Sequence, residues 1–263
     1  MIRDNNRQVA ANPLVYNNGR YAMDFEGFER LAAQRWVKLF LLCSPHNPVG
    51  RVWTREELKR IRDICKRHGI LVVSDEIHCD FVWQGHEHTC YGLLDEDAIV
   101  CAAPSKTFNL AGLQVSHIFV RNAEMRKELR SEFRKTGYGQ LNAVGLSGCK
   151  SVYQKGAPWL DALKEYLQES IRYTKEFLRD ELPKIKLVEP EGTYLLWLDF
   201  SAYELPQAEL DRRITEGAGL WLDGGTMFGI EGDGFQRVNI ACPRSVLRQA
   251  LKQLKEEFKE EIQ

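Results

Sequence analysis

The most constraining feature of the sequence is a pair of short apolar runs with a helical pattern between them. Residues 39–43 read LFLLC and residues 70–74 read ILVVS, and continuous apolar runs of this length are typical of strands buried on both faces. Thr54 and Glu57 have the spacing of a capping box at a helix start, and Gly69 suits a helix end. Strand, helix and strand in this order predict a βαβ unit, and therefore a parallel sheet with helices on its faces.

The same sheet is expected to continue beyond this unit. Two further apolar runs predict strands, at residues 98–102 and 115–120. Stretches with a helical pattern follow them, at residues 122–135 and 141–154. The first half of the chain is therefore predicted to be of the α/β class.

The pattern changes around Gly156. Apolar residues from Trp159 to Leu178 recur on one face of a long helix. Helices then alternate with strand candidates, which lie at residues 194–200, 220–222 and 236–240. The last predicted helix begins at about Ser245. We therefore predict a large domain over residues 1–155 and a smaller α+β domain over residues 156–263.

Composition and charge exclude several classes of function. The 36 Lys and Arg residues nearly balance the 37 Asp and Glu residues, giving a formal net charge of −1. This balance argues against nucleic-acid binding by counterion release and against a polybasic membrane surface. No apolar run approaches the roughly 20 residues of a membrane span, and the start lacks the apolar segment of a signal peptide. We expect a cytoplasmic protein without nucleic-acid or membrane partners.

The sequence gives no support for a metal centre. Its seven cysteines are scattered without a Cys-x-x-Cys pair, so we expect reduced thiols. The segment His86-Glu87-His88 offers two imidazoles but no evident third ligand, and we expect these histidines to be solvated. We therefore predict no metal site.

Polar residues follow three of the predicted strands. Asn47 comes after the strand at 39–43, Asp75 and His78 after the strand at 70–74, and Ser105 and Lys106 after the strand at 98–102. Ligands of open parallel sheets bind beyond the carboxyl ends of the strands, so we expect these residues to converge there. A lysine beside a carboxylate suits pyridoxal phosphate (PLP), which needs a Schiff-base lysine and an acid that keeps its ring nitrogen protonated.

Four segments carry a family resemblance. They read SPHNPVGRVW, VVSDEIHCDF, APSKTFNLAGLQ and GFQRVNIACPRS, in this order. The chain resembles PLP-dependent enzymes of fold type I, in the aminotransferase class I/II superfamily, and more narrowly the PatB/MalY group of cystathionine β-lyases. The DEIH and ACPRS segments favour this group over general aminotransferases, which usually have tyrosine where His78 stands. The resemblance implies a large domain with a parallel-rich sheet, incomplete at its N-terminus, and a smaller α+β C-terminal domain.

The resemblance also implies roles for individual residues. Lys106 is expected to form the Schiff base and later to move the Cα proton, while Asp75 pairs with the pyridine nitrogen. Asn47 is expected to bind the phenolate oxygen, His78 to lie near the ring, and Ser105 to contact the phosphate.

One further position is expected to bind the substrate. Arg237 matches the family residue that grips the α-carboxylate, for which a guanidinium is well shaped. Gln114 departs from the aminotransferase pattern, in which an arginine eight residues after the lysine binds phosphate.

Each assignment has a structural alternative. Asp75 and Ser105 are residue types that also cap helices. His78 also fits a buried structural histidine, and Arg237 also fits a surface position on a strand.

Complete members of the resembled group extend further at the N-terminus. Their strand order implies a missing strand between residues 39–43 and the segment around Val9, which would leave an exposed sheet edge. We therefore expect weak retention of PLP, a rearranged edge, or rescue by another chain.

Three functions remain open at this point. The first is a C–S β-lyase that converts cystathionine or related cysteine S-conjugates to a thiol, pyruvate and ammonia. The second is an aminotransferase on the same site. The third is an inactive fragment or a protein-binding module. The resemblance also implies a homodimer that acts on a small amino-acid substrate.

Overall fold

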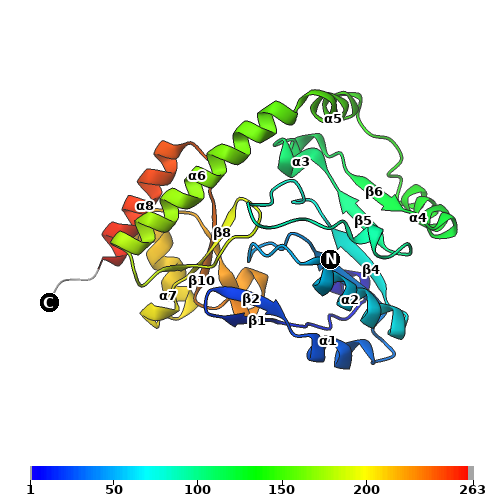
Figure 1. Ribbon diagram of the computed structural model, residues 1–263, viewed down its shortest axis with the longest axis horizontal. Coiled ribbons are helices and arrows are strands. Elements are labelled where there is room, and N and C mark those ends of the chain that lie inside the picture. Colours follow the sequence, from blue (N-terminus) through cyan, green and yellow to red (C-terminus); the bar gives the residue numbers. More distant parts are fainter. Residues whose placement is uncertain (1, 260–263) are drawn as a thin grey trace. The chain divides into compact units, whose positions relative to one another are not determined.

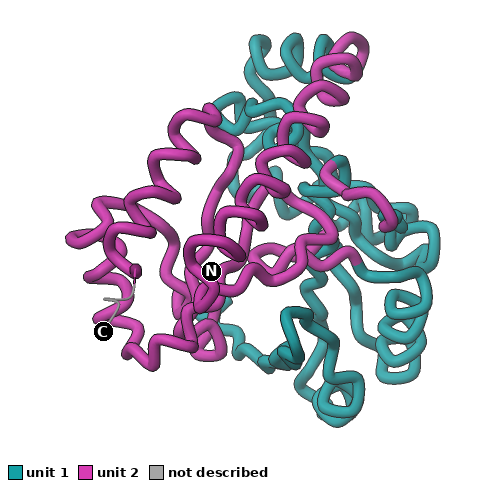
Figure 2. The backbone as a smooth tube through the Cα atoms, turned by 60° about the vertical axis from the view of Figure 1, so that its left-hand side comes forward, with its two compact units in different colours: residues 1–44, 53–80, 87–153 teal, residues 45–52, 81–86, 154–263 magenta. Residues whose placement is uncertain are grey.

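The computed structural model describes residues 2–259, which form two compact units (Figure 2). Unit 1 comprises the chain up to Ser44 together with residues 53–80 and 87–153. Unit 2 comprises residues 45–52 and 81–86 and the chain from Gln154 onward. Unit 2 thus takes two short segments from the first half of the chain. The division into domains at residue 155 stays a prediction.

Unit 1 contains a hairpin, a four-stranded sheet and the helices that follow its strands (Figure 1). Its elements are β1 (Leu14–Asn17), β2 (Arg20–Met23), α1 (Phe25–Ala32), β3 (Leu39–Cys43), α2 (Arg55–His68), β4 (Leu71–Asp75), β5 (Ile99–Ala102), α3 (Pro104–Thr107), β6 (His117–Val120), α4 (Ala123–Lys135) and α5 (Ala143–Lys155), whose last two residues belong to unit 2. The β1–β2 hairpin lies in a region for which no strand was predicted.

The sheet has the order β3-β4-β5-β6, in which β3, β4 and β5 are parallel and β6 is antiparallel to β5. The predicted βαβ unit is confirmed. Thr54 accepts the N–H of Glu57, the Glu57 carboxylate accepts the Thr54 N–H, and Gly69 ends α2 with a φ of +64°. The capping box and the glycine thus set the bounds of this helix as the sequence predicted.

The two faces of this sheet are covered unequally. Side chains alternate between the faces along a strand. On one face, Leu42 and Val72 are 3% and 1% exposed and belong to a core shared with α1 and α2. On the other face, Leu39 and Leu41 are 47% and 51% exposed. Parallel sheets are usually buried on both faces, so the described residues leave bare apolar surface on the face that also carries Asp75.

β3 is an open edge of the sheet. It pairs with β4 and with no second strand among residues 2–259. A groove of about 780 Å³ runs along this edge, with Val9, Trp36, Leu39 and Leu41 among its lining residues. The exposed edge that the family resemblance implied is therefore present.

Unit 2 is built on an antiparallel sheet with the order β7-β8-β10-β9. Its elements are α6 (Ala157–Glu181), β7 (Lys186–Leu187), β8 (Leu195–Asp199), α7 (Gln207–Arg212), β9 (Asp223–Gly224), β10 (Phe235–Asn239) and α8 (Arg244–Phe258). Residues 220–222, predicted as a strand, are not one, because the pairing with β10 begins only at Asp223.

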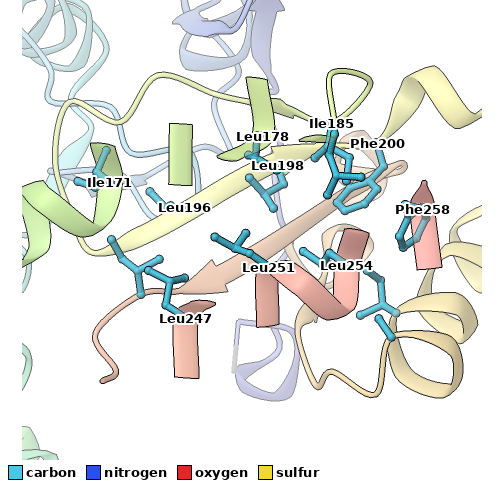
Figure 3. Close-up of a cluster of buried hydrophobic side chains, with 14 of the residues drawn as sticks. Ile171, Leu178, Ile185, Leu196, Leu198, Phe200, Leu247, Leu251, Leu254 and Phe258 are labelled. Atoms are coloured by element: carbon cyan, nitrogen blue, oxygen red, sulfur yellow. The ribbon is translucent and has the colours of Figure 1, made fainter. Parts of the chain in front are cut away.

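The core of unit 2 lies between this sheet and its long helices. Figure 3 shows Leu196 and Leu198 of β8 among side chains of α6 and α8, including Leu178, Leu251 and Leu254. All five side chains are at most 3% exposed. Within the described part of the chain, no helix is long and apolar enough to cross a membrane.

Candidate functional site

Asp75 stands at the carboxyl end of β4. The parallel register places it beside Cys43 of β3 and Cys101 of β5. Its side chain is exposed, and Oδ1 accepts the N–H of Ile77 at 3.1 Å. No other described residue contacts the carboxylate through a hydrogen bond or an ion pair. Most of its hydrogen-bonding capacity is therefore free for a ligand.

Lys106 and Ser105 lie on α3, the short helix that follows the adjacent strand β5 (Figure 1). Lys106 is exposed and makes no hydrogen bond or ion pair with any residue between 2 and 259. The next residue, Thr107, is buried, and its hydroxyl donates to Asp80 Oδ2 at 2.7 Å. This bond ties α3 to the turn after β4. The structure thus brings the carboxylate and the amine to the ends of neighbouring strands.

His78 is buried in the turn at residues 77–80 that follows β4. Its side chain is only 3% exposed, so its environment is structured rather than solvated. Asp75, His78, Ser105 and Lys106 therefore all belong to unit 1, close to the ends of β4 and β5.

Glu76, which the sequence analysis did not single out, braces the same turn. It is 3% exposed, and its carboxylate accepts the Tyr91 N–H at 2.8 Å and the Ser74 hydroxyl at 3.0 Å. His88 Nε2 lies 2.9 Å from its second oxygen. Burial opposes ionisation, but these hydrogen bonds outweigh it and lower the pKa of Glu76. His88 was expected to be solvated, which is wrong, because this contact holds it against the turn.

Asn47 and Arg237 lie together in unit 2. Arg237, on β10, donates from Nη1 to Asn47 Oδ1 at 2.9 Å. Its Nε donates to Asp223 Oδ2 at 3.0 Å, and its Nη2 donates to the same oxygen. The guanidinium carbon lies 4.8 Å from the centre of the Phe228 ring. Arg237 is thus not a free surface residue, and its position is fixed from several sides.

A buried ion pair anchors the segment that carries Asn47. Arg51 and Glu191 have side chains 2% and 3% exposed, and Arg51 Nε donates to Glu191 Oε2 at 2.8 Å. The same oxygen accepts the Val52 N–H at 2.9 Å. Gly50, with a φ of +71°, accepts hydrogen bonds from the N–H groups of Glu191 and Gly192 at its carbonyl oxygen, each at 2.9 Å. These contacts make residues 45–52 part of unit 2 although they follow β3 in sequence.

The predicted site residues therefore fall into two groups, one in each unit. The group in unit 1 fits PLP chemically. It offers an acid, an amine and a hydroxyl (Asp75, Lys106 and Ser105), and the first two have no competing ion pair among the described residues. An acid for the ring nitrogen and a lysine for the aldehyde are the two groups that this cofactor needs most.

The sequence matches the family described as "Aminotransferase class I and II" over residues 5–254. The chain belongs to this family. Cystathionine β-lyase PatB of Bacillus subtilis is 42% identical to it over 259 residues, which cover 97% of this chain and 67% of PatB. Protein MalY of Escherichia coli is 33% identical over 252 residues, covering 95% of this chain and 65% of MalY. This class I/II chain thus spans about two thirds of the length of these relatives.

Solved structures give the same answer for the fold. The crystal structure of cystalysin from Treponema denticola, which contains pyridoxal 5′-phosphate, superposes with a TM-score of 0.96 at 35% identity. The match covers 98% of this chain and 66% of cystalysin. The predicted family and the predicted fold-type I architecture with a parallel-rich sheet are both confirmed.

Proposed function

We propose that this chain is a PLP-dependent C–S β-lyase that cleaves cystathionine or related cysteine S-conjugates. The observation that carries the proposal is the placement of Asp75 and Lys106 at the ends of the adjacent parallel strands β4 and β5, both without an ion pair among the described residues. The relative PatB supports the lyase reaction, since its name is cystathionine β-lyase PatB.

Each residue has a definite task in this proposal. PLP, when bound, supplies an electron sink that stabilises negative charge at the substrate Cα. Lys106 holds the cofactor through its amine, and its Nζ takes the proton from Cα. The Asp75 carboxylate keeps the ring nitrogen protonated. Ser105 contacts the phosphate and His78 lies near the ring.

The residues of unit 2 bind the remaining groups. Asn47 donates its amide N–H to the phenolate oxygen of the cofactor. Arg237 binds the α-carboxylate of the substrate through its guanidinium. Loss of the Cα proton is followed by cleavage of the Cβ–S bond, and the sulfur leaves as a thiolate that takes up a proton. Water then converts the remaining three-carbon fragment to pyruvate and ammonia, so cystathionine yields homocysteine.

The products distinguish this function from the alternatives. We expect purified protein with added PLP to release pyruvate, ammonia and homocysteine from cystathionine in equal amounts. Asp75→Asn should lower the rate at least about 100-fold, because the ring nitrogen loses its anionic partner. Asp97→Asn is the control, since Asp97 is exposed in a loop. A keto acid from the donor, with pyridoxamine phosphate, would instead show an aminotransferase. The absence of any product would contradict the lyase function and favour an inactive fragment or a protein-binding module.

Two further features belong to the same proposal. We propose a homodimer as the assembly and the cytoplasm as the location. The near balance of charge supports the absence of nucleic-acid and membrane-surface partners. Gel filtration at several concentrations tests the assembly.

A further inference from the structure

Arg237 and Asp223 face each other across two strands. The antiparallel register of β10 and β9 pairs them directly, so their side chains lie on the same face of the sheet. Asp223 Oδ2 accepts from both Nε and Nη2 of Arg237. The side chains are 35% and 19% exposed, which leaves the pair partly shielded from water. Asp223 has no other side-chain partner among the described residues.

The pattern of bonds leaves a defined part of the guanidinium open. A guanidinium has five N–H groups in a fixed plane. Asp223 uses the Nε–H and one Nη2–H, and Asn47 uses one Nη1–H. Phe228 covers one face of the plane. One N–H therefore remains on each terminal nitrogen, and two N–H groups are what a carboxylate needs for bidentate binding.

We propose that Asp223 is a positioning residue that fixes the orientation of the Arg237 guanidinium. In this orientation, the two remaining terminal N–H groups of Arg237 can bind the α-carboxylate of an amino-acid substrate. This inference rests on the proposed function for the identity of the substrate. Asp223 also balances the charge of Arg237, so the carboxylate binds through directed hydrogen bonds more than through a net positive field. Binding thus depends on orientation, which Asp223 supplies.

A purely structural role would make different predictions. If Asp223 only strengthens the pairing of β9 with β10, its removal lowers the melting temperature and leaves substrate affinity unchanged. If Asp223 positions Arg237, its removal raises KM and leaves kcat nearly constant, because the chemistry takes place at other residues.

The first experiment observes Arg237 directly, without PLP or substrate. The Nε–H resonance of Arg237 is assigned in a ¹⁵N spectrum by its loss in Arg237→Lys. We expect a slowly exchanging signal in the wild type and rapid exchange in Asp223→Ala. Acetate serves as the carboxylate probe, and half-maximal shift of the signal should require at least about tenfold more acetate in Asp223→Ala.

The second experiment measures kinetics with cystathionine. Asp223→Ala should raise KM at least about tenfold, because Arg237 loses the charge-assisted hydrogen bonds that orient it. The same substitution should change kcat less than about threefold. Asp223→Asn keeps one acceptor oxygen and should raise KM only about threefold. Asp233→Ala is the matched control, because Asp233 is exposed nearby and has no side-chain partner among residues 2–259.

The outcomes separate this inference from the proposed function. Unchanged acetate binding and unchanged exchange in Asp223→Ala would overturn the positioning role, whether or not the protein is a lyase. An unchanged or lowered KM would do the same. A wild type that shows the acetate effect but makes no pyruvate would support the role of Asp223 and contradict the lyase function.

Discussion

The two groups of candidate site residues differ in how much their own unit holds them. In unit 2, Arg237 is bonded to Asp223 and Asn47, and the segment of Asn47 is anchored by the buried pair of Arg51 and Glu191. In unit 1, Lys106 has no partner among the described residues, and the Asp75 carboxylate accepts only one backbone N–H. The residues proposed to bind the substrate are thus held in place by their own unit, whereas the residues proposed to react make few contacts with other described side chains.

The sheets that carry these two groups also differ in how completely other elements cover them. In unit 2, the side chains of Leu196 and Leu198 on β8 pack in a core with side chains of α6 and α8 (Figure 3). In unit 1, the face of the sheet that carries Asp75 leaves Leu39 and Leu41 about half exposed, and β3 is an open edge. Unit 2 is therefore stabilised by its own contacts, while the described residues of unit 1 leave one sheet face and one sheet edge uncovered.

The largest effect on stability is expected in the anchored unit. Glu191→Ala removes the carboxylate that faces the buried Arg51 guanidinium, and breaking a buried pair in this way costs about 3–5 kcal/mol. We expect a matching fall in the free energy of unfolding in urea. Glu189→Ala breaks the exposed pair with Lys175 and should cost less than about 1 kcal/mol. Similar losses for both variants would contradict the anchoring role.

The unequal faces of the unit 1 sheet can be compared at two adjacent residues. Leu42→Ala should cost about 2–5 kcal/mol, because it opens a cavity in the core shared with α2. Leu41→Ala on the bare face should cost only about 0.5 kcal/mol, since this side chain is 51% exposed. Urea unfolding of the two variants measures the free energy that each substitution costs. Equal costs would show that the face is covered in solution, which removes the contrast between the units.

A smaller effect on the free energy of unfolding is expected at Glu76, which follows Asp75 and accepts hydrogen bonds from Tyr91 and Ser74. Glu76→Gln removes a charge that accepts hydrogen bonds and should cost about 1–3 kcal/mol at neutral pH. The folded state lowers the pKa of Glu76, so its contribution is complete above the ordinary value of 4.5 and disappears as the pH falls through the lower folded value. The difference from the wild type should therefore shrink in acid. Glu96→Gln, on the surface, is the control. A difference that grows in acid would refute the pKa direction.

The sequence predicted the parallel sheet well because its signals are local. The apolar runs at 39–43 and 70–74 and the capping box at Thr54 and Glu57 each depend on a few neighbouring residues, and all appear in the structure. The positions of Asp75 and Lys106 at strand ends followed from the apolar runs at 70–74 and 98–102. The one strand that was wrong, at 220–222, lies where pairing with β10 decides the register.

The partners of the site residues could not be predicted in this way. Asp223 meets Arg237 only through a cross-strand register, and Glu191 meets Arg51 across 140 positions of sequence. No periodicity records such contacts, since they depend on how distant segments pair. The membership of residues 45–52 in unit 2 follows from the same long-range contacts.

The most direct test of the central claim is the visible absorption of the purified chain titrated with PLP, measured beside Lys106→Ala. A lysine and a carboxylate lie at neighbouring strand ends, and neither forms an ion pair with residues 2–259; this placement predicts a band of bound PLP in the wild type that is absent from Lys106→Ala. A band of equal strength in both proteins, or none in either, would contradict the assignment of Lys106 as the residue that holds the cofactor.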